Sequence, residues 1–144
     1  MRHKVSGWHL SRNSAQRTAL RKNLIGDLFA HGEIVTTEAK ARMLRPAAER
    51  IITIAKRGLA KGGSSAVHAR RLVAARIFRD RVVEEDAAYV EVDALKKLFD
   101  EIAPRFAERP GGYTRLIKLP RRQGDNAKMA LVQLVETASE EATS

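Results

Sequence analysis

The sequence predicts an α+β fold in which about four helices pack on a small mixed three-stranded sheet, preceded by a basic N-terminal extension. Several segments repeat apolar residues every three to four positions, as amphipathic helices do. Three short segments are rich in β-branched or alternating apolar residues, as strands are. The 144 residues suffice for one domain with a core, and because only 5% are aromatic, that core must be aliphatic.

The first thirteen residues are predicted to form a basic arm without hydrophobic periodicity. The first helix then spans residues 14–31, with Ser14 as N-cap and Gly32 as its C-terminal stop. Arg17 and Arg21 share an angular face with the apolar residues but lie one or two turns earlier. The apolar stripe consists of Leu20, Leu24, Ile25, Leu28 and Phe29.

A β-branched segment, residues 33–37, predicts the first strand, and Thr36 or Thr37 can cap a second helix that ends near Gly58. Pro46 would cost about 3 kcal/mol inside a straight helix, so a kink or two abutting helices are expected there. The glycine- and serine-containing residues 58–65 favour a flexible connection.

A third helix is predicted from Ser64 or Ser65 to about residue 79, followed by an acidic stretch interpreted as a solvated acidic cap. Asp93 is the predicted cap of a fourth helix, residues 94–102, which ends before Pro104.

Two strands, residues 113–119 and 129–136, close the fold around a Gly-Asp-Asn turn. The first strand lies far from this hairpin in sequence, so we expect a mixed sheet. The predicted organisation is a basic arm over 1–13, one α+β domain over 14–136 and a polar acidic tail over 137–144.

The net charge of +10 and a pI near 10.5 indicate a polyanionic partner. The absence of cysteine excludes disulfides, thiolate zinc sites and cysteine nucleophiles, and fits a reducing compartment. No apolar run approaches the ~20 residues of a membrane span. A basic N-terminus is also found in organellar transit peptides, but residues 17–22 continue directly into a helix with core residues, so we expect a cytoplasmic protein.

Basic residues cluster in three segments. Residues 1–22 carry six Lys or Arg and no acid, residues 38–79 carry eleven against two acids, and residues 105–128 carry seven against two. Solvated faces are the alternative, but guanidinium groups make bidentate contacts to phosphate that ammonium groups do not. The clusters as groups therefore favour phosphate contact.

Two aromatic residues lie among these cations. Tyr113 in the segment PGGYTR offers a face on which a base could stack, or it enters a strand half-buried behind a tight glycine loop. Trp8 would stack on a base or lie on the protein body.

No catalytic constellation is evident. The four histidines lack metal-ligand spacing with carboxylates, and consecutive acids such as Glu84, Glu85 and Asp86 diverge on a helix or strand, so an Mg²⁺ site is disfavoured. No phosphate loop, nucleophile elbow or dinucleotide-binding motif occurs. The sequence predicts no enzyme activity, cofactor, metal or small-molecule substrate.

The motifs MRHKVSG, NSAQRTALRKNL, TTEAKARMLRP, ITIAKRG, PRFAERPGGYTRLIK and GDNAKMALVQLV resemble, in this order, the family of protein seventeen of the bacterial large ribosomal subunit. The resemblance covers residues 1–135. It implies a small α/β body with a basic N-terminal extension, which binds large-subunit ribosomal RNA near the exit of the nascent-chain tunnel and adjoins other ribosomal proteins. The acidic residues 80–86 and the C-terminal tail match least well.

Charge and resemblance together predict an RNA-binding protein of the ribosome, with a DNA-binding regulator and an RNA-processing enzyme as the competing classes. The predicted RNA-binding residues are Arg2, His3, Lys4, Trp8, Arg12, Arg17, Arg21, Lys22, Arg42, Arg45, Arg105, Arg109, Tyr113, Arg115, Lys118, Arg121 and Arg122.

Overall fold

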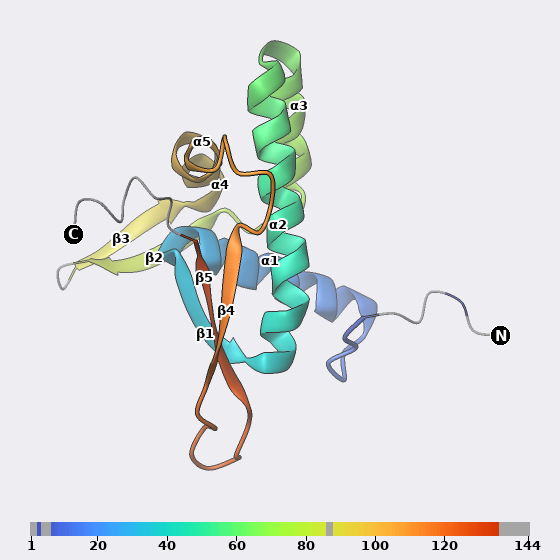
Figure 1. The fold of residues 1–144 in the computed structure, drawn as a ribbon, viewed down its shortest axis with the longest axis vertical. Coiled ribbons are helices and arrows are strands. Elements are labelled where there is room, and N and C mark those ends of the chain that lie inside the picture. The colour runs from blue at the N-terminus through green and yellow to red at the C-terminus, as the bar shows by residue number, and fades with distance from the viewer. Residues whose placement is uncertain (1–2, 4–6, 86–87, 136–144) are drawn as a thin grey trace.

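The computed structural model describes residue 3, residues 7–85 and residues 88–135. Within these residues, helices and a three-stranded sheet form an α+β fold, as predicted, and a separate two-stranded hairpin projects beside them (Figure 1). The elements are α1 (Ser14–His31), β1 (Glu33–Thr37), α2 (Glu38–Lys61), α3 (Gly63–Ala74), β2 (Asp80–Glu85), β3 (Ala88–Asp93), α4 (Ala94–Lys97), the π-helical η1 (Leu98–Ile102), α5 (Ala103–Arg105), β4 (Thr114–Leu119) and β5 (Met129–Leu134).

The three-stranded sheet has the order β1-β5-β4, and both pairings are antiparallel. The prediction that this sheet is mixed is therefore wrong. β1 does run in the same direction as β4, but β5 lies between them and pairs with each. Val35, Leu131 and Ile117 form one cross-strand row, which fixes the register of all three strands.

Helix α1 has the predicted bounds, but its N-cap is Asn13 and not Ser14. The Asn13 side chain accepts a hydrogen bond from the Gln16 backbone N–H (2.9 Å), and the Gln16 side chain accepts one from the Asn13 N–H (3.3 Å). This reciprocal capping box satisfies two N–H groups at the start of the helix. Gly32 ends the helix with φ +82°.

Helix α2 extends as one helix through Pro46 and past Gly58. The predicted end at Gly58 was therefore wrong, and Pro46 does not divide the segment into two abutting helices. Gly58 is buried where α2 meets α3, and a Cβ atom at this position would lie 2.3 Å from the Cβ of Ala69. Its role is to allow close helix packing and not to end the helix. Only Gly62 separates α2 from α3, in place of the flexible connection expected over residues 58–65.

The acidic stretch after α3 forms the antiparallel β2–β3 hairpin, which replaces the predicted solvated cap. Helix α3 correspondingly ends at Ala74 and not near residue 79. Asp93 then caps α4 as predicted, since its carboxylate accepts hydrogen bonds from the backbone N–H groups of Leu95 (2.9 Å) and Lys96 (3.1 Å). The helical segment continues through η1 and α5 to Arg105, so it ends three residues later than predicted.

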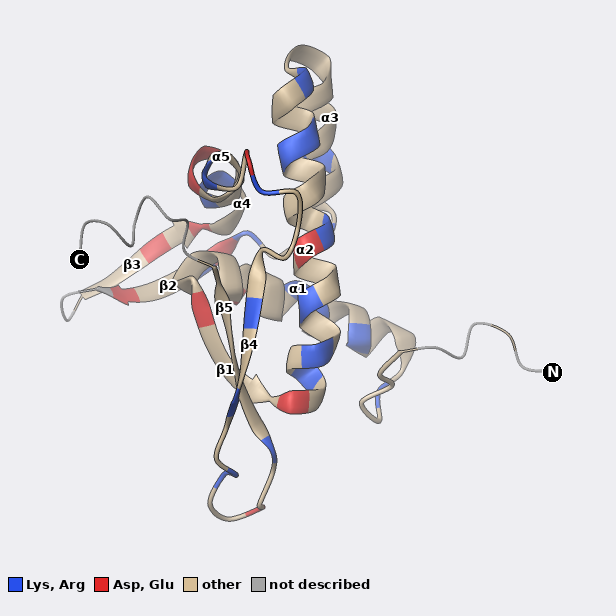
Figure 2. Ribbon diagram, in the orientation of Figure 1, with Lys and Arg blue, Asp and Glu red and all other residues tan. Residues whose placement is uncertain are grey.

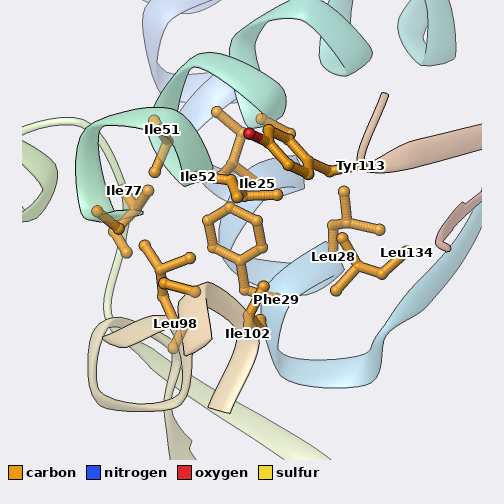
Figure 3. Packing of buried hydrophobic residues seen from close by; sticks show 14 of the residues in the cluster. Ile25, Leu28, Phe29, Ile51, Ile52, Ile77, Leu98, Ile102, Tyr113 and Leu134 are labelled. Atoms are coloured by element: carbon orange, nitrogen blue, oxygen red, sulfur yellow. The ribbon is translucent and has the colours of Figure 1, made fainter. Parts of the chain in front are cut away.

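One buried cluster joins α1, α2, the α4–α5 segment and the sheet (Figure 3). Aliphatic residues dominate it, as expected, and its aromatic members are Phe29, Phe99, Phe106 and Tyr113. The core fixes α1 against α2, which positions the basic residues described next. None of the helices within the described residues is long and apolar enough to cross a membrane.

Candidate nucleic-acid interface

A groove of about 770 Å³ lies between the N-terminal segment, α1, α2 and the end of α3. We call it the basic groove, because its described lining holds six Lys or Arg and no Asp or Glu. Apolar side chains, including the buried Ile25, Met43 and Ile51, contribute to its wall. Its lining residues are Gly7, Trp8, His9, Arg17, Thr18, Arg21, Lys22, Ile25, Arg42, Met43, Pro46, Ala47, Arg50, Ile51, Ala75 and Arg76.

Helical spacing explains how two elements present cations to the same groove. Arg17 and Arg21 are four residues apart on α1, and Arg42 and Arg50 are eight apart on α2, so each pair shares one helix face. Figure 2 shows these basic segments on neighbouring stretches of α1 and α2. The fold thereby brings together cations separated by more than twenty residues of sequence.

Residues of the predicted arm continue the wall of the groove. The Trp8 side chain is 48% exposed and also lines a second hollow of about 380 Å³, together with Arg42, Arg45, Pro46 and Glu49. Arg17 holds this segment in place, since its Nη1 donates to the Arg12 carbonyl oxygen (2.9 Å) and lies 3.1 Å from His9 Nδ1.

Two predicted RNA-binding residues on α2 also have partners within the protein. Arg42 pairs with Glu38 (2.5 Å), and this hydrogen bond lowers the pKa of the Glu38 carboxyl group. Arg45 donates to the hydroxyl and carbonyl oxygens of Thr114 (3.4 Å each), so it links α2 to β4. Arg42 still borders the basic groove, whereas Arg45 borders only the smaller hollow.

Tyr113 belongs to the core. Its side chain is only 2% exposed, its ring lies 5.1 Å from that of Phe106, and its hydroxyl accepts a hydrogen bond from Lys56 Nζ (3.1 Å). The ring therefore has no free face for base stacking in this structure. The side chain is also more deeply buried than the half-buried position predicted from the sequence as the alternative. The preceding loop is tight, as predicted: Gly112 has φ +64°, and Arg109 Nε donates to the carbonyl oxygens of Gly111 and Gly112.

Among the predicted residues that the structure describes, the others do not line the basic groove. Arg115 and Lys118 are exposed on β4, and Arg121 and Arg122 are exposed in the turn that follows, where Arg122 pairs with Asp125 (2.5 Å). Arg105 lies over the ring of Phe106 at 5.1 Å. His3 and Arg12 are exposed, whereas Arg2 and Lys4 fall outside the described residues.

The residues of this chain match the family model described as ribosomal protein L17 over positions 20–135. A large ribosomal subunit protein bL17 from Exiguobacterium sibiricum is 46% identical over 88% of this chain and 96% of the relative. The bL17 protein of Anaeromyxobacter dehalogenans is 46% identical over 96% of this chain and 74% of its own length, and that of Shouchella clausii is 47% identical over 88% and 96%. The chain belongs to the ribosomal protein L17 family.

Membership in the L17 family confirms the predicted resemblance and places the chain among ribosomal proteins, which are structural constituents and not enzymes. The matched residues include five cations of the basic groove, whereas Trp8 and Arg17 precede the matched range. Within the described part of this L17-family chain, no group of three or more His, Cys, Asp or Glu lies together in a way that could hold a metal ion.

Three groove residues, His9, Arg50 and Arg76, were absent from the predicted set. The spacing of Arg42, Pro46 and Arg50 carried a signal for Arg50, because positions i, i+4 and i+8 lie on one face of a helix. Arg76 lies beyond the end of α3, and only the packing of α3 on α2 brings it to the groove. Arg76 belongs to the basic cluster of residues 38–79, but nothing in the sequence distinguishes it from the other cations of that cluster.

Proposed function

We propose that this L17-family chain is a structural constituent of the large ribosomal subunit that binds large-subunit ribosomal RNA and stabilises its fold near the nascent-chain tunnel exit. In this proposal it is cytoplasmic and ribosome-bound, and it adjoins other large-subunit proteins. The observation that carries the proposal is the basic groove, in which six cations converge without an acid among the described lining residues.

The chemistry of the groove suits an RNA backbone. The guanidinium groups of Arg21, Arg50 and Arg76 have no hydrogen-bond or ion-pair partner among the described residues, so they are free to bind phosphate oxygens in bidentate fashion. Trp8 and the apolar wall add a surface against which an unstacked base can lie. Gathering so many cations is costly for the protein alone, and phosphates would offset that repulsion.

The remaining cations support contact with more than one RNA segment. Arg115 and Lys118 on β4, and Arg121 in the following turn, are exposed on a hairpin that projects away from the groove (Figure 2). A basic groove and a basic hairpin on one rigid body can hold two RNA segments in a fixed relative position, which is how a small protein stabilises a folded RNA.

The salt dependence of RNA binding tests the role of the groove. We expect the full chain to bind large-subunit ribosomal RNA with an affinity that falls steeply with salt, since each phosphate contact releases about one counterion. The slope of log K against log salt is negative. Arg21→Gln and Arg50→Gln should each make it less steep, by about 1. Filter binding or fluorescence anisotropy across a salt series measures this slope.

Lys96→Gln is the matched control, because it removes one exposed positive charge from α4, away from the groove. It should leave the slope unchanged. Equal slope changes for all three variants would show a nonspecific charge effect and contradict the proposed interface. Equally tight binding to duplex DNA would favour the DNA-binding alternative over a ribosomal RNA partner.

A further inference from the structure

The β2–β3 hairpin carries an exposed face of a different character from the rest of the chain. In the antiparallel register Val82 pairs with Glu91 and Glu84 pairs with Tyr89, and residues paired across two strands point to the same side. These four residues form what we call the outer hairpin face. Val82 is 55% and Tyr89 78% exposed, whereas Val83 on the opposite side is only 9% exposed.

The hairpin is firmly attached at its base. Arg79, which precedes β2, pairs with Asp93 at the end of β3 (2.5 Å). Arg81 pairs with Asp27 of α1 (2.8 Å) and donates to the Asn23 carbonyl oxygen (3.2 Å). The segment that leads into the hairpin also packs closely on α1, since a Cβ atom at Gly26 would lie 2.6 Å from the Phe78 carbonyl oxygen. The outer hairpin face is thus held in place before any partner arrives.

The charges on this face disfavour RNA. Glu84 and Glu91 are exposed and pair with no cation among the described residues, although the chain as a whole carries a net charge of +10. Figure 2 shows acidic segments on β2 and β3, whereas the charged segments visible on α1 and α2 are mostly basic. Two carboxylates beside a phosphate backbone would repel it, and exposed Tyr and Val side chains next to them suit a partner with apolar groups.

We propose that the outer hairpin face docks a cationic segment of a neighbouring protein, in which Lys or Arg side chains meet Glu84 and Glu91 and apolar side chains cover Val82 and Tyr89. The inference rests on the proposed function, because a ribosomal setting supplies such a neighbour. It divides the surface of the chain by partner: the basic groove binds RNA, and the outer hairpin face binds protein.

Site-specific cross-linking in assembled large subunits tests this proposal. A full chain with the photoreactive residue p-benzoyl-phenylalanine in place of Tyr89 is incorporated into subunits, irradiated and analysed for cross-linked protein and RNA. We expect a cross-link to a protein segment rich in Lys and Arg that resists ribonuclease. The same photoreactive residue at Val90, whose side chain points to the opposite side of the strand, should give several-fold less of this product.

Charge reversal supplies the second readout. Glu84→Lys with Glu91→Lys should lower the cross-link yield from position 89 at least about threefold, because attraction becomes repulsion. Glu101→Lys with Glu108→Lys, two exposed acids on other parts of the chain, changes the net charge equally and should leave the yield unchanged.

The outcomes separate this inference from the proposed function. A cross-link from position 89 to RNA or to a second copy of this chain, no cross-link at all, or a yield indifferent to the charge reversal would overturn the docking proposal while the chain still co-sediments with large subunits. Failure to co-sediment would instead contradict the proposed function itself.

Discussion

Some guanidinium groups of this protein pair with acids of the same chain, and others in the basic groove do not. Arg81 and Arg122 are held by carboxylates of the same chain, at 2.8 Å from Asp27 and 2.5 Å from Asp125. Arg21, Arg50 and Arg76 have no such partner among the described residues, and all three line the basic groove. Sequence clusters alone did not separate the two kinds, because both are Arg-rich. Asp125 lies only three residues from Arg122, whereas the fold is needed to bring Asp27 to Arg81.

The Asp125 carboxyl group offers a test of one internal pair. The hydrogen bonds from Arg122 and from the Ala127 N–H lower the pKa of Asp125 to about 2, from an ordinary value of 3.8. Because the folded pKa is lowered, the pair stabilises the turn above pH 3.8 and this contribution is lost as the pH falls through about 2. Carboxyl NMR titration should find this midpoint.

Arg122→Gln should raise the pKa of Asp125 toward 3.8, whereas Arg121→Gln should leave it unchanged, because Arg121 donates to the Asn126 carbonyl oxygen (3.4 Å) and not to the carboxylate. An Asp125 midpoint near 3.8 in the unaltered protein would contradict the pairing.

Trp8 reports on occupancy of the groove, because it is the only tryptophan in the chain and is 48% exposed. Saturating large-subunit ribosomal RNA should shift its fluorescence emission and lower its accessibility to acrylamide. High salt, which dissociates the RNA, should restore both values. Unchanged emission and quenching in the presence of bound RNA would show that Trp8 lies outside the interface.

Among the elements, the helices and strands with strong periodicity were predicted with nearly correct bounds, as α1 and β1 illustrate. The role of Gly58 was predicted wrongly because a glycine near a helix end gives the same local signal whether it ends the helix or lets a neighbouring helix approach. Only the contact with Ala69 of α3, which the sequence does not reveal, distinguishes the two roles. The β2–β3 hairpin was missed because charged residues interrupt its β-branched pattern.

The α2–α3 contact gives a prediction at this scale. Gly58→Ala should destabilise the protein by about 1–3 kcal/mol, because overpacking against Ala69 outweighs the ~1 kcal/mol that alanine gains over glycine in a helix. Chemical denaturation measures the change. Adding Ala69→Gly should restore much of the loss by reopening the space.

Gly111→Ala is the matched control, because a Cβ at that position meets nothing within 4 Å and the backbone is not left-handed. It should leave stability nearly unchanged. If Gly58→Ala were as well tolerated as Gly111→Ala, the close approach of α2 and α3 would be wrong.

At the level of the whole molecule, charge is divided between surfaces and not spread evenly. The basic groove combines α1, α2 and the end of α3, and the outer hairpin face carries acids and exposed apolar groups (Figure 2). Composition predicted a polyanionic partner, and helix spacing pointed to part of the groove. Arg76 and the burial of Tyr113 could not be predicted, because both follow from contacts between elements distant in sequence.

A structure of the large ribosomal subunit containing this chain, determined by electron cryomicroscopy, tests the central claim most directly. We predict RNA phosphate oxygens within about 4 Å of several groove guanidinium groups, among them Arg21 and Arg50. A groove that opens to solvent in the assembled subunit, with no RNA near these residues, would contradict the account.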